Sequence, residues 1–469
     1  MQPRTLLSFS QGTTLEETPD GARAVRGSAG VALGYPAPTV LAALQRLARV
    51  GASEEELATE VLSSGGEFAL AALYVCLERL SAAGLIRHTL CLGDTSLVTV
   101  EPLTSGDRFA ARPVDPEERF LLSRFAASRR DGERLVVESP AARARAVVHD
   151  RRVGALLVDL SAPSSLRQLA ALPTALPEPV LGPLLGLLLD AGLLCEVTAE
   201  GAVVELPALA HWEPHDLLFH ARSRRGRHQG PYGPTYRFGR LMSLPPAVTP
   251  RSPEEGLALY RPDIEALKRA DVPFTRVLEE RRSRRTHAQA PLQALQLGEL
   301  LYRAARVRRR FTGELTELTD RPYPGGGALY ELELYLAVAR CDGVEPGLHH
   351  YDPEHHRLHL VREPGPEVAR LMAEAVSSAE TQDVQVLVIL AARFQRVMWK
   401  YEAMAYALIL KDAGVLLQTL CLVAEAMGLA ACPIGGGDAE LFARAAGMSS
   451  LIEGSVGELI LGSRPGTSS

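Results

Sequence analysis

The sequence predicts an α+β fold divided into about three domains, and three observations support this. The chain has 469 residues, and one domain typically takes about 100–200 residues. In the first half, apolar residues recur at helical spacing and strand-like stretches follow them. In the second half, apolar strand-like segments are combined with a long helical stretch, residues 405–428. That helix is hydrophobic on nearly all sides, which indicates burial in a core or at a dimer interface.

Composition and charge exclude several classes of protein. Hydrophobic residues make up 46% of the chain and charged residues 23%, as in folded globular proteins. The 50 Lys and Arg against 56 Asp and Glu leave a net charge of −6, which argues against a general nucleic-acid binder. No uncharged apolar run reaches about 18 residues, so we expect no membrane span, and the N-terminus lacks the apolar core of a secretion signal. The six cysteines are scattered without a C-x-x-C pair, so we expect reduced thiols in a cytoplasmic protein.

The first half contains one pattern twice. In each copy two helical stretches end at a glycine, Gly84 in the first and Gly192 in the second, and a strand-like stretch follows. This order is the layout of a winged helix. We therefore predict one winged-helix-like module in residues 1–105 and a second in residues 106–210.

The second copy is poorly suited to DNA. Its presumed recognition helix, residues 180–189, carries no Lys or Arg to displace the counterions of phosphate. The residues leave two interpretations open. The modules form a peptide-binding tandem in which an extended ligand adds to the edge of the wing, or they are scaffolding for the second half.

Residues 211–269 are predicted to be a linker rich in Pro, Gly and Arg, ahead of a last domain in residues 270–469. Several arginines with interleaved aromatic residues occur between Asp216 and Glu254, and no acidic residue lies among them. A nucleic-acid patch is one interpretation. Because the whole chain is acidic, we favour a linker whose arginines pair with acidic neighbours or with a partner subunit.

Three short motifs in the last domain would each fit a surface charge run or a flexible turn when taken alone. Together and in this order, they indicate a phosphate-bearing ligand held against bare backbone. Arg281, Ser283 and Arg285 alternate, so in an extended chain two guanidinium groups and a hydroxyl share the face that suits a phosphate. The segment 324–327 contains three glycines, where backbone approaches a ligand without a colliding Cβ. The Pro–Gly segment 433–436 allows the same approach.

In this order, these pieces resemble the nitroreductase fold, and specifically the SagB-type dehydrogenases. These are the flavin-dependent azoline oxidases of thiazole/oxazole-modified peptide biosynthesis. Lys400-Tyr401, Gly347–Pro353 and Lys411–Gln418 match as well, and the resemblance covers roughly residues 210–463. The N-terminal modules resemble the peptide-clamp modules fused to such oxidases. The implied architecture is a C-terminal nitroreductase-like FMN domain preceded by two winged-helix-like modules.

The resemblance implies FMN as the cofactor. The family usually has Ser where this chain has Gly325, so one hydrogen bond to the cofactor would be absent here. The implied cofactor-binding residues are Arg281, Arg282, Ser283 and Arg285 at the phosphate; Pro324, Gly325, Gly326 and Gly327 against the flavin; Pro433, Ile434, Gly435 and Gly436 near its N5/O4 edge; and Arg464 as a further phosphate contact.

The resemblance also implies Lys400 and Tyr401 as the catalytic pair. Aromatising a thiazoline removes a proton from the α-carbon and a hydride from the neighbouring ring carbon; the hydride goes to flavin N5, with reoxidation by O₂. A desolvated lysine can serve as the base for the proton, and Tyr401 would pass the proton on or orient the ring. The family often carries an Arg-Gly-Tyr-Arg-like run nearby, of which only Tyr406 is present here, so we expect different substrate contacts.

The implied function is FMN-dependent dehydrogenation of thiazoline or oxazoline rings. The substrate would be a cyclised peptide, recognised through a leader peptide, or a carrier-bound azoline. The implied assembly is a homodimer that works with a cyclodehydratase. Two alternatives stay open: an NAD(P)H-dependent nitroreductase or flavin reductase, which has no need of a peptide clamp, and a non-catalytic peptide-binding scaffold, which the departures at Gly325 and around Tyr406 leave open.

A histidine-rich segment is the remaining candidate site. Imidazole is a common metal ligand, but the pattern is strand–turn–strand, and alternation would divide the side chains between two faces. We therefore expect no metal, and we expect neither nucleic acid nor a membrane as a partner. The histidines are His349, His350, His355, His356 and His359.

Overall fold

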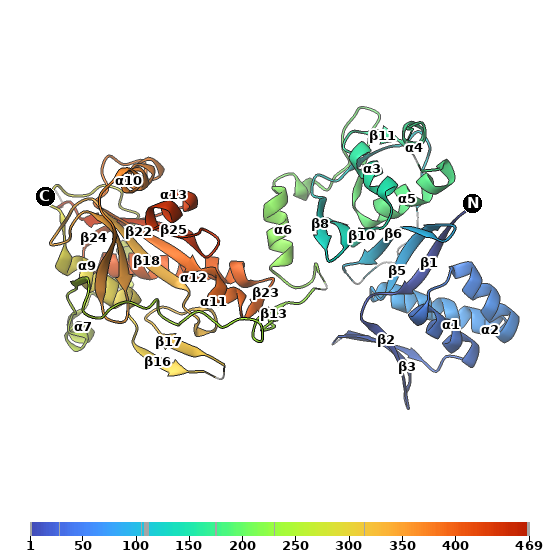
Figure 1. Ribbon diagram of the computed structural model, residues 1–469, viewed down its shortest axis with the longest axis horizontal. Helices are drawn as coiled ribbons and strands as arrows, with labels where there is room; N and C mark the ends of the chain where they lie inside the picture. Colours follow the sequence, from blue (N-terminus) through green and yellow to red (C-terminus); the bar gives the residue numbers. More distant parts are fainter. Residues whose placement is uncertain are drawn as a thin grey trace. The chain divides into compact units, whose positions relative to one another are not determined.

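The computed structural model describes residues 2–27, 29–104, 106, 112–173, 176–228, 230–313 and 315–466. The chain forms two compact units, Met1–Gly230 and Pro231–Ser469 (Figure 1). The finer predicted division, at residues 105, 210 and 269, stays a prediction.

A six-stranded antiparallel sheet organises the first unit, in the order β1-β5-β6-β10-β9-β8. Its central pair joins β6 to β10, with Ala146 opposite Val100. Strands from both predicted N-terminal modules therefore share one sheet, and the predicted boundary at residue 105 lies between its two halves. The strands are β1 (Pro3–Phe9), β5 (Ile86–Leu92), β6 (Thr95–Pro102), β8 (Ala127–Asp131), β9 (Arg134–Glu138) and β10 (Ala144–Val148).

Two helices pack beside the N-terminal strands, α1 (Pro38–Arg49) and α2 (Glu54–Ala82). Ser53 and Glu56 form a capping box that begins α2. The helix bends at Gly66, whose φ of 73° is not helical. Gly84, with φ 69°, ends the helical region as expected. A small sheet of β2 (Thr13–Thr18), β3 (Gly21–Arg26) and β4 (Ala29–Gly34) precedes them.

The second predicted module contains the expected helices and glycine. Gly192 ends α5 (Glu178–Ala191) in the left-handed conformation, with φ 80°. Leu184 and Leu188 of α5 are fully buried, so this helix lies in a core rather than on a DNA-binding face. The winged-helix assignment itself stays a prediction. The other elements are β7 (Arg119–Leu122), α3 (Arg151–Asp159), β11 (Ser164–Ser165), α4 (Leu166–Ala170) and β12 (Leu194–Val197).

The predicted linker is less irregular than its composition indicates. It contains α6 (Pro214–Arg222) and most of α7 (Ile264–Ala270), and η1 (Pro207–Leu209) ends just before it. Pro214 stands at the first position of α6, where proline is compatible with a helix. The side chain of Asp263 caps α7. Between these helices runs a largely irregular segment, residues 231–262, which we call the arm.

A seven-stranded sheet forms the centre of the second unit, in the order β14-β21-β20-β18-β22-β25-β24. On β18 (Leu332–Val338), Leu334 and Leu336 face α9 (Ala294–Ala305) and α12 (Ala405–Ala426). Tyr335 and Ala337 face the opposite core. Both faces of the sheet are thus covered by helices (Figure 1), which explains why the strand is apolar without alternation.

Short elements complete the second unit. The strands of its sheet are β14 (Leu257–Ala258), β20 (Gly347–Asp352), β21 (Arg357–Arg362), β22 (Val386–Arg393), β24 (Leu429–Ile434) and β25 (Glu453–Ser463). The other elements are β13 (Gly233–Pro234), α8 (Phe274–Glu280), β15 (Leu292–Gln293), β16 (Arg309–Thr312), β17 (Glu317–Asp320), η2 (Gly326–Ala328), β19 (Cys341–Asp342), α10 (Pro366–Ser378), α11 (Phe394–Met398), β23 (Tyr401–Glu402) and α13 (Ala439–Ala446). The core on the far face from α12 contains residues of α10 and α13.

Among the described residues, α2 and α12 are long and apolar enough to cross a membrane on length and composition alone. Core helices of globular domains pass the same test. Leu416 and Leu420 of α12 are fully buried in the core of the second unit, and α2 is interrupted at Gly66.

Candidate active site

The glycine turn and the Lys–Tyr pair predicted from the sequence meet in the second unit. Gly327 has φ 64°, a conformation that favours glycine. A Cβ added to Gly327 would lie 2.6 Å from Tyr401 Oη and 2.8 Å from Lys400 Nζ. The missing side chain therefore makes room for an amine and a phenol hydroxyl on one piece of bare backbone.

An acidic pair lies beneath this turn. The N–H of Gly326 donates to Asp412 Oδ2 of α12 at 2.8 Å. Glu331, which is fully buried, lies beside Asp412. Burial, followed by the negative charge of Asp412, raises the pKa of Glu331 to about 8. Burial also raises the pKa of Asp412. The pair therefore holds a proton near neutral pH while one oxygen anchors the turn.

The phosphate motif lies beside β24, near the other end of α12. The N–H of Arg284 donates to the carbonyl of Ala431 at 3.0 Å. The side chains of Arg284 and Arg464 both bind the carboxylate of Glu425. Arg464, predicted as a phosphate contact, therefore lies beside the motif with its guanidinium engaged by a carboxylate. Arg284 stands between Ser283 and Arg285, so the predicted alternation puts it on the opposite face, and its side chain faces the protein.

The predicted phosphate ligands themselves are not engaged by the protein. In the described part of the chain, the side chains of Arg281, Arg282, Ser283 and Arg285 form no hydrogen bond or ion pair. Arg282, Ser283 and Arg285 are also exposed. Guanidinium groups without a carboxylate partner are suited to binding an anionic ligand.

The second glycine loop follows β24 at the same end of the sheet as the glycine turn. Ile434, the last residue of β24, pairs with Glu458 of β25, and Gly454 of β25 pairs with Ala392 of β22. Ala392 in turn pairs with Leu332, the first residue of β18, which follows the glycine turn. A Cβ added to Gly435 or Gly436 would meet nothing within 4 Å. This backbone is therefore open to a ligand.

The two groups of predicted residues rest on different stretches of α12. Asp412 supports the glycine turn, and Glu425 holds the arginines beside the phosphate motif. The 425 − 412 = 13 residues between them span about 20 Å of helix. A ligand that reached both groups on one chain would have to be elongated.

Comparisons with known proteins place the second unit in a family. The nitroreductase family model matches residues 278–463. The chain is 30% identical over 180 residues to a putative nitroreductase of Methanocaldococcus jannaschii, covering 84% of that protein and 38% of this chain. The chain belongs to the nitroreductase family. The nitroreductase-superfamily resemblance inferred from the sequence is thereby confirmed.

Three further similarities concern other parts of the chain or the fold. The model of the cyanobactin oxidase ThcOx matches residues 120–229. A trifolitoxin-processing protein of Rhizobium leguminosarum bv. trifolii is 30% identical over 160 residues, which are 30% of this chain and 41% of that protein. The crystal structure of a putative nitroreductase from Ralstonia eutropha shares 22% identity, with 50% of this chain and 99% of that chain covered and a TM-score of 0.37.

Family membership confirms FMN as the expected cofactor, and the residues present fit it. The unengaged forks of Arg281 and Arg285 suit its phosphate, and the open backbone at Gly435 and Gly436 suits a flat ring. The departure at Gly325 has a local reason. A Cβ there would lie 3.1 Å from two ring carbons of Tyr330, closer than most Cβ contacts, so a serine would press on that ring.

A buried polar network surrounds Glu333, a residue that belongs to the family match but to which the sequence assigned no role. This carboxylate binds Arg393 at 3.0 Å, His350 at 3.0 Å and Thr249 of the arm at 2.9 Å. Burial alone would raise the pKa of Glu333, but the hydrogen bond and charge of His350 and the charge of Arg393 hold it well below its usual range. Acidic residues at the start of an otherwise apolar strand were the available sequence signal.

The histidine-rich segment has protein partners instead of a shared centre. Among the described residues, no group of three or more His, Cys, Asp or Glu side chains is arranged to hold a metal ion. The partners are the Glu345 carbonyl for His349, Glu333 for His350, Asp352 for His355 and His359, and both Tyr351 Oη and the Tyr260 carbonyl for His356.

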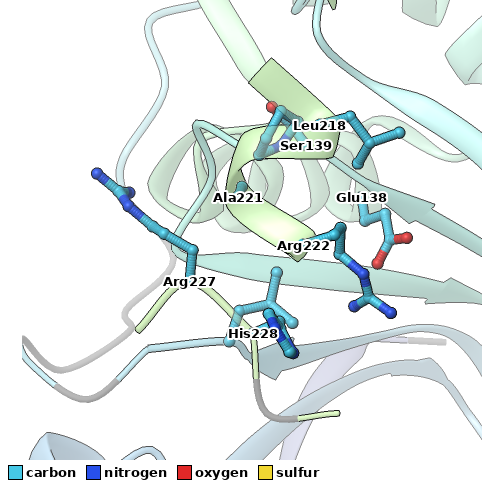
Figure 2. A pocket seen from close by; sticks show the side chains of 9 residues that line it. Glu138, Ser139, Leu218, Ala221, Arg222, Arg227 and His228 are labelled. Carbon is cyan, nitrogen blue, oxygen red and sulfur yellow. The ribbon is translucent and has the colours of Figure 1, made fainter. Parts of the chain in front are cut away.

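A small hollow in the first unit is lined by Leu103 and by residues of the segment that matches the cyanobactin oxidase model. Figure 2 shows Leu218, Ala221 and Arg222 of α6 beside Glu138 and Ser139. Glu138 is already paired with Arg129 at 2.8 Å. The hollow lies between α6 and the end of β9.

The acidic pair gives a testable pH dependence. The pKa of Glu331 is about 8 when folded against 4.5 for a free side chain. Between these values only the folded chain holds the proton, so the free energy of unfolding falls as pH rises through that window. The side chain of Glu331→Gln cannot ionise. We therefore expect its melting temperature to fall less than that of the wild type when the pH is raised from about 6 to about 9.

The measurement is scanning calorimetry at both pH values. The exposed Glu363→Gln is the matched control and should follow the wild type. Parallel losses in the wild type and Glu331→Gln would show that Glu331 does not hold its proton in the folded protein.

Proposed function

We propose that the chain is an FMN-dependent azoline oxidase that converts thiazoline or oxazoline rings of a peptide to thiazoles or oxazoles. The observation that carries this proposal is the convergence of Lys400 Nζ and Tyr401 Oη on the bare backbone of Gly327. A base beside a flat open surface is what removal of a ring α-proton requires. Membership in the nitroreductase family supports the oxidoreductase part.

The chain's own residues would divide the work as follows. Arg281, Ser283 and Arg285 bind the phosphate of FMN. The chemistry that bound FMN supplies is hydride acceptance at N5, with reoxidation by O₂. The neutral amine of Lys400 takes the α-proton, and Tyr401 orients the ring or passes the proton on. Asp412 keeps the glycine turn in place through the N–H of Gly326.

Two similarities, beyond membership in the nitroreductase family, support a peptide substrate. One relative is a trifolitoxin-processing protein, and residues 120–229 match the cyanobactin oxidase model. We propose that the N-terminal unit binds the leader part of such a peptide and that a cyclodehydratase supplies the azoline. A carrier-bound azoline would be processed without any effect of a leader peptide.

The test combines a spectrum with an assay. The purified protein should show flavin bands near about 370 and 450 nm, and a thiazoline-containing peptide should lose two hydrogen atoms per ring in air, as read by mass spectrometry. A flavoprotein that reduces nitro compounds with NAD(P)H but leaves the azoline unchanged would be a reductase. A colourless protein that cannot be loaded with FMN would be a scaffold.

A homodimer is the expected assembly, because apolar side chains of the second unit lie exposed. Phe274 and Leu278 of α8 are 66% and 45% exposed, and Tyr406 and Leu410 of α12 are 40% and 38% exposed. Exposed apolar clusters of this kind mark association surfaces, and a C₂ dimer would bury each patch twice. Light scattering should give twice the chain mass, and Leu410→Glu should lower it; a wild-type monomer with tightly bound FMN would refute the dimer.

A further inference from the structure

The arm is fastened to the catalytic pair by its backbone. Gly233 and Pro234 form β13, which pairs with Tyr401 and Glu402 of β23. The N–H of Tyr236 donates to the carbonyl of Lys400 at 3.1 Å. The arm thus forms backbone pairs with every residue from Lys400 to Glu402.

Side chains reinforce this attachment on both sides. Thr235 and Arg237 both donate to the carboxylate of Glu402, at 3.0 Å and 3.2 Å. Further along the arm, Trp399 Nε1 donates to the carbonyl of Met242 at 2.7 Å. The segment around residue 236 is therefore held from before and after.

Tyr236 is in a strained conformation at the centre of this attachment. Its φ is 51°, in the left-handed region that bulky residues rarely adopt. Such strain costs about 1–3 kcal/mol and persists only where surrounding contacts hold it. In this conformation the ring lies edge-on to that of Trp399, with ring centroids 5.8 Å apart.

The same conformation places the ring beside the proposed base. Lys400 Nζ lies 5.8 Å from the ring centroid of Tyr236 and 5.3 Å from that of Tyr401. Both distances are below about 6 Å, so both rings border the amine. A lysine has four rotatable side-chain bonds and loses much freedom when it is held in one place, so two flanking rings restrict where its amine points.

We propose that Tyr236 is a positioning residue, supplied by the arm, that holds Lys400 Nζ over the Gly327 turn. The proposal rests on the proposed role of Lys400 as the base. Tyr236 lies before residue 278, where the match to the nitroreductase family begins. The positioning group is therefore an addition to the family segment and gives the arm a role beyond connecting two units.

The test uses the scarcity of lysine in this chain, which has only Lys268, Lys400 and Lys411. Reductive ¹³C-methylation keeps the positive charge and yields one NMR signal per lysine, and Lys400→Ala assigns the one of interest. In FMN-loaded protein we expect ring currents to displace the Lys400 signal from the other two. Tyr236→Leu should move it toward them, and Tyr236→Phe should leave it displaced.

Activity measurements separate a positioning role from an effect on folding. Tyr236→Leu should lower kcat for the azoline peptide about tenfold to a hundredfold with little change in KM or FMN content, since small displacements of a reacting group have effects of this size. Tyr236→Phe should restore the rate. The matched control is Leu241→Ala, on the same arm and 76% exposed, which should change neither the signal nor the rate.

The outcomes distinguish the two proposals. An unchanged Lys400 signal in Tyr236→Leu, or an equal loss in Tyr236→Phe, overturns the positioning role whatever the enzyme's substrate. A signal that moves as expected in a protein with no azoline oxidation upholds the placement of Lys400 and rejects the proposed function.

Discussion

Replacing Lys400 with alanine is expected to lower azoline oxidation about 10²–10⁴-fold, the usual effect of losing a general base. The flavin spectrum and the dimer should be unchanged, because the Lys400 side chain forms no ion pair with a carboxylate in the described part of the chain. Single-turnover kinetics with the thiazoline peptide would locate the loss in the chemical step.

Two variants sharpen this result. Tyr401→Phe keeps the ring beside Lys400 and removes only the hydroxyl, so it tests proton transfer apart from packing. Lys268→Ala, at an exposed position on α7, is the matched lysine control and should retain full activity. If Lys400→Ala oxidises the azoline near the wild-type rate, or loses activity only together with FMN, Lys400 is not the base.

Replacing Arg281 and Arg285 together with alanine is expected to release FMN. Each charge-assisted contact contributes about 1.5–3 kcal/mol, so the dissociation constant of FMN should rise about 10²–10⁴-fold. Equilibrium dialysis followed by flavin fluorescence measures this directly.

The control for charge alone is Arg269→Ala, an exposed arginine on α7. Its FMN affinity should equal that of the wild type. Full flavin occupancy in the double variant at low FMN concentration would show that the phosphate binds elsewhere on the chain.

Local patterns predicted the parts of the site that depend on residue type. The glycines of 324–327, the alternation at Arg281–Arg285 and the apolar helix that became α12 were each recognisable because glycine, arginine and helical periodicity have direct physical consequences. Their order along the chain carried the family resemblance.

The residues that position the site could not be found in this way. Asp412 is one acidic residue on an apolar helix and Glu331 one at the start of an apolar strand; only the folded topology brings them together beneath Gly326. The attachment of the arm could not be predicted for the same reason, because β13 and β23 are two-residue strands that pair across more than 160 residues. No periodicity signals so short a pairing.

The attachment of the arm also decides where this protein can be cut and rejoined in evolution. Buried Arg396 donates to the carbonyl of Pro245, and Arg393 donates to that of Pro246. A recombination that fused a new partner directly to residue 278 would leave both guanidinium groups without these acceptors, and an unsatisfied buried charge is costly. A junction after Gly230 preserves them. The segment that must be inherited together therefore begins before residue 278, where the family match begins. The additional residues include Tyr236, which borders the candidate active site.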